Sequence, residues 1–215
     1  LFARVQTGVR TSVIQEECKR RNLLYAGDPC SADSCQIGGN VATNAGGNKA
    51  VKYGTTRNQI YGMKVVMPNG DIVDVGARLQ KCSTGYCLEQ LICGSEGTLG
   101  VVTEVTLKLR PLPPYKFDLV AIFDDDAKAF ALPNKIIKAG IEPTSIEYMD
   151  NKALDMCSKF CKVTLPHVDK GCCYVIITVE TFDEDELDKK MEKISDLCEA
   201  EAAVDVIQAD DRIWG

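Results

Sequence analysis

The residues best suited to chemistry lie in one glycine-rich stretch, Ile37-Gly38-Gly39-Asn40-Val41-Ala42-Thr43-Asn44-Ala45-Gly46-Gly47. Glycine weakens ordinary helices and strands, so a run with four glycines in eleven positions needs a physical reason. A backbone without Cβ atoms lets N–H groups approach the phosphate or ring carbonyl oxygens of a ligand closely. We therefore favour a ligand contact over the alternative, which is a tight loop or crowded helix packing. The spacing fits neither G-x-G-x-x-G nor G-x-x-x-x-G-K-[ST], so a nicotinamide-type Rossmann site or a P-loop loses its main support.

A second glycine-rich stretch, Gly94-Ser95-Glu96-Gly97-Thr98-Leu99-Gly100, runs directly into an alternating segment that begins at Val101. Glycines at the entry to a strand expose backbone amides and carbonyls, which suit the edges of an adenine or isoalloxazine ring. By itself, this stretch indicates only a turn before a strand. The ligand hypothesis therefore requires that the regions around Asn44 and Glu96 converge in space and line one wall of a nucleotide-shaped groove.

The two stretches belong to a longer ordered set that includes Gly27-Asp28-Pro29, Lys52-Tyr53-Gly54 and Gly85-Tyr86. With this set the sequence resembles the FAD-linked oxidases, the family of glycolate, D-lactate and D-2-hydroxyglutarate dehydrogenases within the vanillyl-alcohol oxidase group. The resemblance is strong over nearly all of residues 1–112. Over residues 113–215 it is weaker and rests mainly on the order of the elements.

The resemblance implies an α+β fold with two domains. Residues 1–112 correspond to the second lobe of a PCMH-type FAD-binding domain, in which the flavin lies between two lobes. Residues 113–215 correspond to the N-terminal part of the C-terminal cap or substrate domain, a ferredoxin-like α+β unit with an antiparallel sheet. The first lobe would precede Leu1 and the rest of the cap would follow Gly215. We therefore expect a fragment that binds FAD weakly or not at all and does not turn over alone.

The resemblance also implies which residues contact the flavin, whereas it assigns no catalytic residue and no metal site here. A first group of residues would contact the pyrophosphate, ribitol and ring of the flavin. Tyr53 and Gly54 would close the wall that this group forms. A third group would present side chains or backbone to the cofactor. The sequence departs from the family pattern at Cys30, where serine is common, and at Cys87, where aspartate is common. The first group is Pro29, Gly38, Gly39, Thr43, Asn44, Gly46 and Gly47, and the third is Glu96, Gly97, Gly100 and Val102.

The activity that the resemblance implies is oxidation of a small 2-hydroxy acid by hydride transfer to FAD. Electrons would then pass to a quinone, an electron-transfer protein or an Fe–S subunit. Two alternatives stay open: a flavin oxidase of another alcohol or amine, and a non-catalytic scaffold or interaction subunit of an electron-transfer complex. His167, the only histidine, would be the usual base for alcohol oxidation. We interpret it as a surface or hydrogen-bonded residue of a loop.

Composition sets limits that agree with this interpretation. The chain has 215 residues, 45% of them hydrophobic and 26% charged, which is typical of globular domains. A net charge of −6 argues against nucleic acid as a partner. No apolar run approaches the roughly 18–20 residues that span a bilayer, and no secretory signal is visible. Eleven cysteines, an odd number, indicate reduced thiols rather than a disulfide framework, so we expect a cytoplasmic protein.

The elements expected in the first half are two strands, one helix and a hairpin. Ser12 and Gln15 form a plausible capping box for a helix that runs to Arg20. Asn69-Gly70 indicates a hairpin turn. Alternation predicts that Val101, Val105, Leu107 and Leu109 share one face of a strand. The expected strands are Ala3–Thr7, Ile60–Met67, Ile72–Val75 and Val101–Leu109, and the half ends near Pro111-Leu112-Pro113-Pro114.

The second half alternates strands and helices, which predicts a sheet with helices on one side. Pro133 should kink or interrupt the first helix. The acidic runs Asp124-Asp125-Asp126 and Asp183-Glu184-Asp185-Glu186 are typical of solvated helix N-termini. The expected strands are Lys116–Phe123, Thr144–Met149, Cys173–Glu180 and Val204–Ala209, and the expected helices are Asp126–Ala139, Lys152–Phe160 and Glu184–Glu201.

Overall fold

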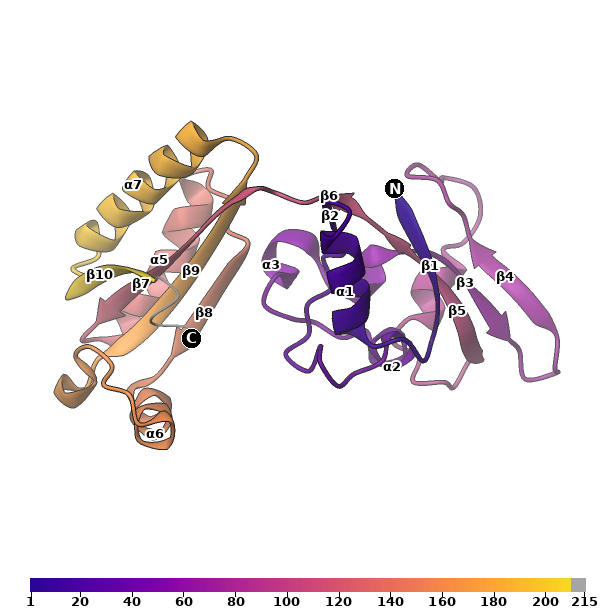
Figure 1. Cartoon of the computed structure of the whole chain (residues 1–215), viewed down its shortest axis with the longest axis horizontal. Helices are drawn as coiled ribbons and strands as arrows, with labels where there is room; N and C mark the ends of the chain where they lie inside the picture. Colours follow the sequence, from indigo (N-terminus) through magenta and orange to yellow (C-terminus); the bar gives the residue numbers. More distant parts are fainter. Residues whose placement is uncertain (210–215) are drawn as a thin grey trace. The chain divides into compact units, whose positions relative to one another are not determined.

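The structure is a computed structural model that describes residues 1–209. The chain forms two compact units, Leu1–Leu112 and Pro113–Gly215, each with its own sheet and core. Figure 1 shows one unit in indigo to magenta and the other in orange to yellow. Among the described residues, no helix combines the length and the apolar character needed to cross a membrane.

The first unit is built on a four-stranded antiparallel sheet in the order β1-β5-β3-β4. Its turn at Asn69-Gly70 joins β3 to β4, as expected, and Gly70 there has a φ of 90°, which glycine adopts without strain. A two-stranded ladder of β2 and β6 lies beside the sheet. The strands are β1 (Phe2–Gln6), β2 (Leu23–Leu24), β3 (Ile60–Val66), β4 (Ile72–Gly76), β5 (Val101–Lys108) and β6 (Arg110–Pro111).

Short helices cover one face of this sheet. Ile14 of α1 and Ile37 and Val41 of α2 pack with Val105 and Leu107 of β5 in the buried core of the unit. The other face carries polar pairs such as Arg4 with Glu104, whose charged atoms lie 2.8 Å apart. The helical elements are α1 (Thr11–Lys19), α2 (Ile37–Thr43), α3 (Ala50–Tyr53), the 3-10 turn η1 (Thr56–Gln59) and α4 (Leu88–Ile92).

The predicted capping box of α1 is wrong. The helix begins at Thr11, after Arg10, and no side chain caps it. The Gln15 amide instead donates to the Gly27 carbonyl at 2.8 Å and to Asp28 Oδ1 at 3.0 Å. Tertiary contacts decide where this helix starts, because Thr11 is fully buried and Arg10 pairs with Gln36 in an isolated β-bridge.

The prediction that Val101 shares one face of its strand with Val105 is also wrong. The register between β3 and β5 shifts so that Lys64 lies opposite Glu104 but Val65 lies opposite Val102. The extra residue is Thr103, and such a bulge reverses the facing of every residue before it. Val102 therefore packs against the core, while Val101 is 63% exposed.

The second unit has an antiparallel sheet in the order β10-β7-β9-β8. Its chain order, β-α-β-β-α-β with α6 inserted, is ferredoxin-like, which confirms the predicted fold class. Asp125 and Asp183 accept bonds from the first turns of α5 and α7, so both acidic runs do begin helices. The elements are β7 (Tyr115–Phe123), α5 (Asp126–Lys138), β8 (Ser145–Met149), α6 (Asn151–Cys161), η2 (Val168–Lys170), β9 (Cys173–Thr181), α7 (Glu184–Ala200) and β10 (Asp205–Ala209).

Helices lie on both faces of this sheet rather than on one. Ile136 of α5 and Ile194 of α7 pack against one face in the larger core. Leu154 of α6 packs with Val120 and Ile122, whose side chains belong to the other face. Pro133 does not interrupt α5, which stays helical from Asp126 to Lys138 because its buried side chains hold it against the sheet.

Candidate functional site

The two glycine-rich stretches lie against each other in the first unit. The Gly94 N–H donates to the Val41 carbonyl and the Glu96 N–H donates to the Ala42 carbonyl, each at 2.9 Å. These two bonds join the last turn of α2 to the turn formed by Gly94–Gly100. The convergence that the ligand hypothesis requires is therefore present.

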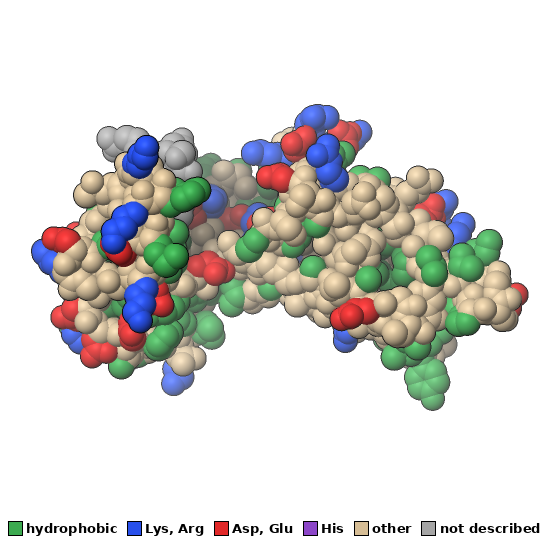
Figure 2. Space-filling model, turned by 90° about the horizontal axis from the view of Figure 1, so that it is seen from below, with side chains coloured by type: hydrophobic (Ala, Val, Ile, Leu, Met, Phe, Trp, Pro, Cys, Tyr) green, Lys and Arg blue, Asp and Glu red, His purple; other side chains and the backbone are tan. Residues whose placement is uncertain are grey.

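A groove of about 360 Å³ opens where these stretches meet the ends of β1 and β5. Five of the thirteen predicted cofactor contacts line it, namely Gly38, Gly39, Gly97, Gly100 and Val102. In Figure 2 the first unit is seen from the side on which α2 lies in Figure 1, and most of the charged side chains visible on it gather along its upper edge. Sequence reasoning missed Thr7, Gly8, Gln36, Ala42, Ile92, Ser95 and Val101, which also line the groove.

The other eight predicted contacts lie outside this lining. Gly47 lies against Asp28, next to Pro29, and the Thr43 hydroxyl donates to the Gly39 carbonyl at 3.0 Å. Glu96 is exposed and has a left-handed φ of 52°. The structure places Pro29, Gly46, Gly47, Tyr53 and Gly54 in or beside the segments around α3, and Thr43, Asn44 and Glu96 where α2 meets the turn.

The glycines of the groove divide into two kinds. A Cβ atom on Gly39 or Gly97 would meet nothing within 4 Å, so both leave open surface for a ligand. A Cβ atom on Gly38 would lie 2.6 Å from Thr7 Cβ, and one on Gly100 would lie 2.7 Å from Val65 Cγ1. Gly38 and Gly100 are therefore required by packing within the unit, whereas Gly39 and Gly97 shape the groove.

The backbone donors of the groove come from the turn rather than from α2. The Gly38 N–H donates to Thr7 and the Gly39 N–H to Gln36, at 2.9 and 3.0 Å. Within the described part of the chain, the N–H groups of two lining residues of the turn, Gly97 and Gly100, donate to no acceptor. Free N–H groups beside a side-chain-free surface can bind phosphate or ring carbonyl oxygens.

Asn44 supports the site from within. It ends α2 in the left-handed conformation, with a φ of 51°. Its side-chain oxygen accepts from the Thr55 hydroxyl and from the Arg57 N–H, both at 2.9 Å. Because this oxygen is already bonded, its role is to connect α2 to η1.

The two units carry opposite charge. Residues 1–112 hold thirteen Lys and Arg against nine Asp and Glu, whereas residues 113–215 hold twelve against 22. The groove therefore lies in the basic part of an acidic chain. A basic unit favours an anionic ligand through its long-range potential.

The remaining candidates for chemistry have partners of their own. His167 Nε2 lies 3.2 Å from Asp205 Oδ2, and Lys170 Nζ lies 3.1 Å from His167 Nδ1. Over residues 1–209, no group of three or more His, Cys, Asp and Glu side chains is placed to hold a metal. No catalytic residue is assigned.

Comparisons with known proteins match both units. A family described as FAD binding domain matches residues 1–76, and one described as FAD linked oxidases, C-terminal domain, matches residues 112–213. The D-lactate dehydrogenase of Anaerostipes hadrus is 36% identical over 211 residues, covering 96% of this chain and 44% of that protein. The glycolate oxidase subunit GlcD of Bacillus subtilis is 37% identical over 206 residues, covering 96% and 43%.

The fold also matches that of a solved structure. Alkyldihydroxyacetonephosphate synthase superposes with a TM-score of 0.80 at 21% identity, covering 100% of this chain and 41% of that one. The two units share their α+β fold with this solved structure. The chain belongs to the FAD-linked oxidase family. It spans less than half the length of these curated relatives.

FAD is the cofactor of this family, and the groove fits such a group. The open surface at Gly39 and Gly97 would accept a flat ligand. The free N–H groups of Gly97 and Gly100 would bind its oxygens, and the basic unit would favour its pyrophosphate.

Proposed function

We propose that residues 1–112 form the second lobe of an FAD-binding domain and that the groove is part of the wall that holds the flavin nucleotide. The observation that carries the proposal is the pair of hydrogen bonds from Gly94 to Val41 and from Glu96 to Ala42, which hold the two glycine-rich stretches against each other. Gly38, Gly39, Gly97, Gly100 and Val102 would form this wall. The contacts expected at Pro29, Thr43, Asn44, Gly46, Gly47, Tyr53, Gly54 and Glu96 would extend or support it.

Residues 113–215 would form the N-terminal part of the substrate domain, and the whole protein would oxidise a small 2-hydroxy acid by hydride transfer to FAD. The support is the 36–38% identity to a D-lactate dehydrogenase and to glycolate oxidase subunits. The fold by itself does not select the substrate, because a protein named alkyldihydroxyacetonephosphate synthase shares it with a TM-score of 0.80. Turnover of a panel of 2-hydroxy acids by the whole protein tests the substrate class.

The electron acceptor and location form the remaining part of the proposal. One relative is named as a subunit of glycolate oxidase, which supports transfer of electrons to a partner subunit. All eleven cysteines are free thiols, which supports a reducing compartment such as the cytoplasm. Co-purification of the tagged whole protein from its source tests for a partner.

Binding of FAD to the 215-residue chain tests whether the groove holds the flavin nucleotide. Because the chain would supply one of the two lobes of the FAD-binding domain, we expect a Kd for FAD weaker than about 10 µM. This Kd corresponds to less than about 7 kcal/mol of binding free energy. FAD at millimolar concentration should protect the amides of Gly97–Gly100 from hydrogen exchange and leave α7 unaffected. A purified sample that retains equimolar flavin would contradict the expectation of weak binding.

Two substitutions of Gly39 provide a test variant and its matched control. Gly39→Val fills open groove without meeting protein atoms, so it should abolish the protection while the fold and its melting temperature stay within a few degrees of the original. Gly39→Ala adds one methyl group and should change the Kd by less than about threefold. Unchanged FAD binding by Gly39→Val, or protection confined to another surface, would exclude this groove.

A further inference from the structure

Arg57 lies beside the C-terminal end of α2 and the start of the Gly94–Gly100 turn, the two segments that meet at the groove. It belongs to η1, and its side chain is half-buried. Its backbone N–H donates to Asn44 Oδ1 at 2.9 Å, and its Nη2 donates to the Cys93 carbonyl at 2.8 Å. One residue therefore connects the C-terminal end of α2 with the peptide that enters the Gly94–Gly100 turn.

The fit around this guanidinium is close. A Cβ atom on Gly94 would lie 3.1 Å from Arg57 Nη2 and 3.2 Å from Asn44 Cβ, so the turn passes directly over both side chains. Gly94 has a φ of 89°, which allows the chain to turn here without strain. The position of the turn, and of its free N–H groups, thus depends on the contacts of Arg57.

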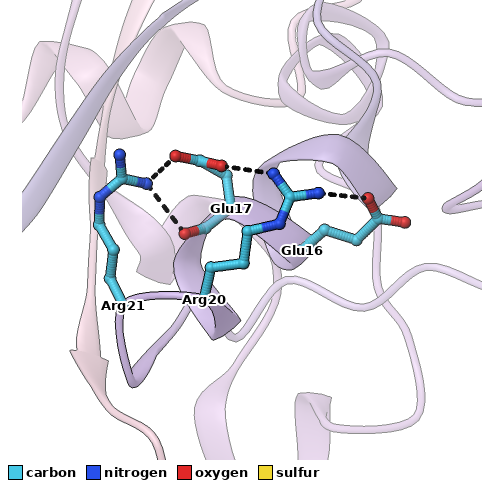
Figure 3. Close-up of polar contacts among 4 residues, drawn as sticks. All are labelled: Glu16, Glu17, Arg20 and Arg21. Atoms are coloured by element: carbon cyan, nitrogen blue, oxygen red, sulfur yellow. Dashed lines mark hydrogen bonds and ion pairs between the residues drawn. The ribbon is translucent and has the colours of Figure 1, made fainter.

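The charge of Arg57 has no counter-ion. Among the described residues, no carboxylate lies within 4.0 Å of its guanidinium, and its Nε is buried without an acceptor. Figure 3 shows the contrasting case on α1, where Arg20 and Arg21 both pair with glutamates on an exposed surface. A half-buried, unpaired cation is costly unless an anion approaches it.

The charge of Arg57 also affects the neighbouring thiol of Cys93. Burial raises the pKa of Cys93, and the Arg57 charge opposes that rise. Cys93 precedes Gly94 directly, so this charge lies at the entry to the Gly94–Gly100 turn. An anionic ligand in the groove would be attracted by a charge that no carboxylate of the described residues neutralises.

We propose that Arg57 is the positioning residue of the groove and that its unpaired charge makes the groove prefer the anionic pyrophosphate of FAD over a neutral flavin. The positioning role follows from the two bonds to Asn44 and Cys93, and the selective role follows from the missing counter-ion. This inference rests on the proposed function. Arginine suits both roles because its planar guanidinium holds a carbonyl while its charge remains fixed.

The positioning role is tested by hydrogen exchange in the chain without ligand. Arg57→Gln should raise the exchange rates of the hydrogen-bonded amides of Gly94, Ser95 and Glu96 by about tenfold, the factor expected for the loss of one hydrogen bond to a charged donor. Arg57→Lys keeps the charge and should give an intermediate increase. Arg20→Gln removes one cation from the exposed face of α1 and should leave these rates unchanged. Unchanged rates in Arg57→Gln would overturn the positioning role.

The selective role is tested by comparing FAD with riboflavin, which lacks the pyrophosphate. Arg57→Gln should weaken FAD binding by about tenfold and riboflavin binding by less than about threefold, and it should reduce the salt dependence of FAD binding. Arg57→Lys should restore the original FAD-to-riboflavin ratio, which a purely structural role would not do. Equal weakening of both ligands by Arg57→Gln would overturn the selective role.

The two tests separate this inference from the proposed function. If FAD protects no amide of the groove in the unaltered chain, the proposed function fails, and the preference for pyrophosphate fails with it. The exchange comparison still decides whether Arg57 positions the turn, because it needs no ligand. If Arg57→Gln does not fold, Arg57→Lys supplies the same comparison with the charge retained.

Discussion

The main chain of Gly47 lies directly against the backbone carbonyl of Asp28, so closely that a Cβ atom on Gly47 would overlap that oxygen. The neighbouring Gly46 faces open space, where an added Cβ atom meets nothing within 4 Å. Two adjacent glycines of the same stretch therefore exist for different physical reasons. Gly47 permits a close approach of two backbone segments, whereas Gly46 is not required by packing.

This difference gives the first prediction. Gly47→Ala should reduce the free energy of unfolding by about 2 kcal/mol or more, because backbone must move to accept the methyl group. Gly46→Ala is the matched control and should change the free energy by less than about 0.5 kcal/mol. Urea unfolding followed by circular dichroism measures both. Similar losses for the two variants would contradict the close approach to Asp28.

The N-terminus of α7 gives the second prediction. The Asp183 carboxylate accepts the Glu186 N–H at 3.0 Å, so Asp183→Ala removes a helix cap and should cost about 1 kcal/mol. Asp185 lies in the first turn and makes no capping bond, so Asp185→Ala should cost less than about 0.5 kcal/mol through the helix dipole. Equilibrium unfolding in urea compares the variants. Equal costs would show that Asp183 acts only through its charge.

The buried thiol of Cys198 gives a pH-dependent prediction. Burial raises the pKa of Cys198 to about 12 from an ordinary value of 9.0. Above pH 9 the unfolded thiol ionises while the folded thiol keeps its proton, so the unfolded state binds fewer protons and stability falls as pH rises. The expected slope from this thiol is about −1.4 kcal/mol per pH unit up to pH 12.

Unfolding free energies of the original chain and of Cys198→Ala measure this slope between pH 8 and the alkaline limit of reversible unfolding. The variant should be less stable at pH 8, because it loses packing, yet its stability should fall less steeply with pH. The comparison isolates Cys198 from Cys173, where burial also raises the pKa, to about 11. Parallel curves for the two proteins would contradict the assignment.

Thiol exposure gives the fourth prediction. Five cysteines are exposed, namely Cys30, Cys82, Cys87, Cys157 and Cys161, and five are buried. A chromogenic disulfide reagent at pH 8 should therefore modify about five thiols rapidly in the folded chain and all eleven in urea. Peptide mapping after brief labelling identifies them. Rapid modification of Cys93 or Cys198 would contradict the burial described for the two cores.

Much of the fold follows from patterns in the sequence, because hairpin and strand signals are local. The Asn69-Gly70 turn and the acidic starts of α5 and α7 are set by residues within a few positions of one another. The capping box of α1 failed because Gln15 has distant partners, Gly27 and Asp28. No local pattern shows a partner twelve or thirteen residues away.

The same limit applies to the site. The composition of the two glycine-rich stretches predicts a groove, but it does not separate Gly39, which faces open space, from Gly38, which packs on Thr7. The bulge at Thr103 reversed the facing of Val101, and alternation cannot reveal an inserted residue. Arg57 carried no signal of its own, because its importance arises from an acceptor at Cys93, 36 positions away.

The two units carry net charges of opposite sign, so they respond differently to a charged surface. With an excess of four positive charges in residues 1–112 and ten negative charges in residues 113–215, an anion-exchange surface at pH 7 would capture the chain by its C-terminal half. Residues 1–112, with their opposite net charge, would contribute little to this attachment.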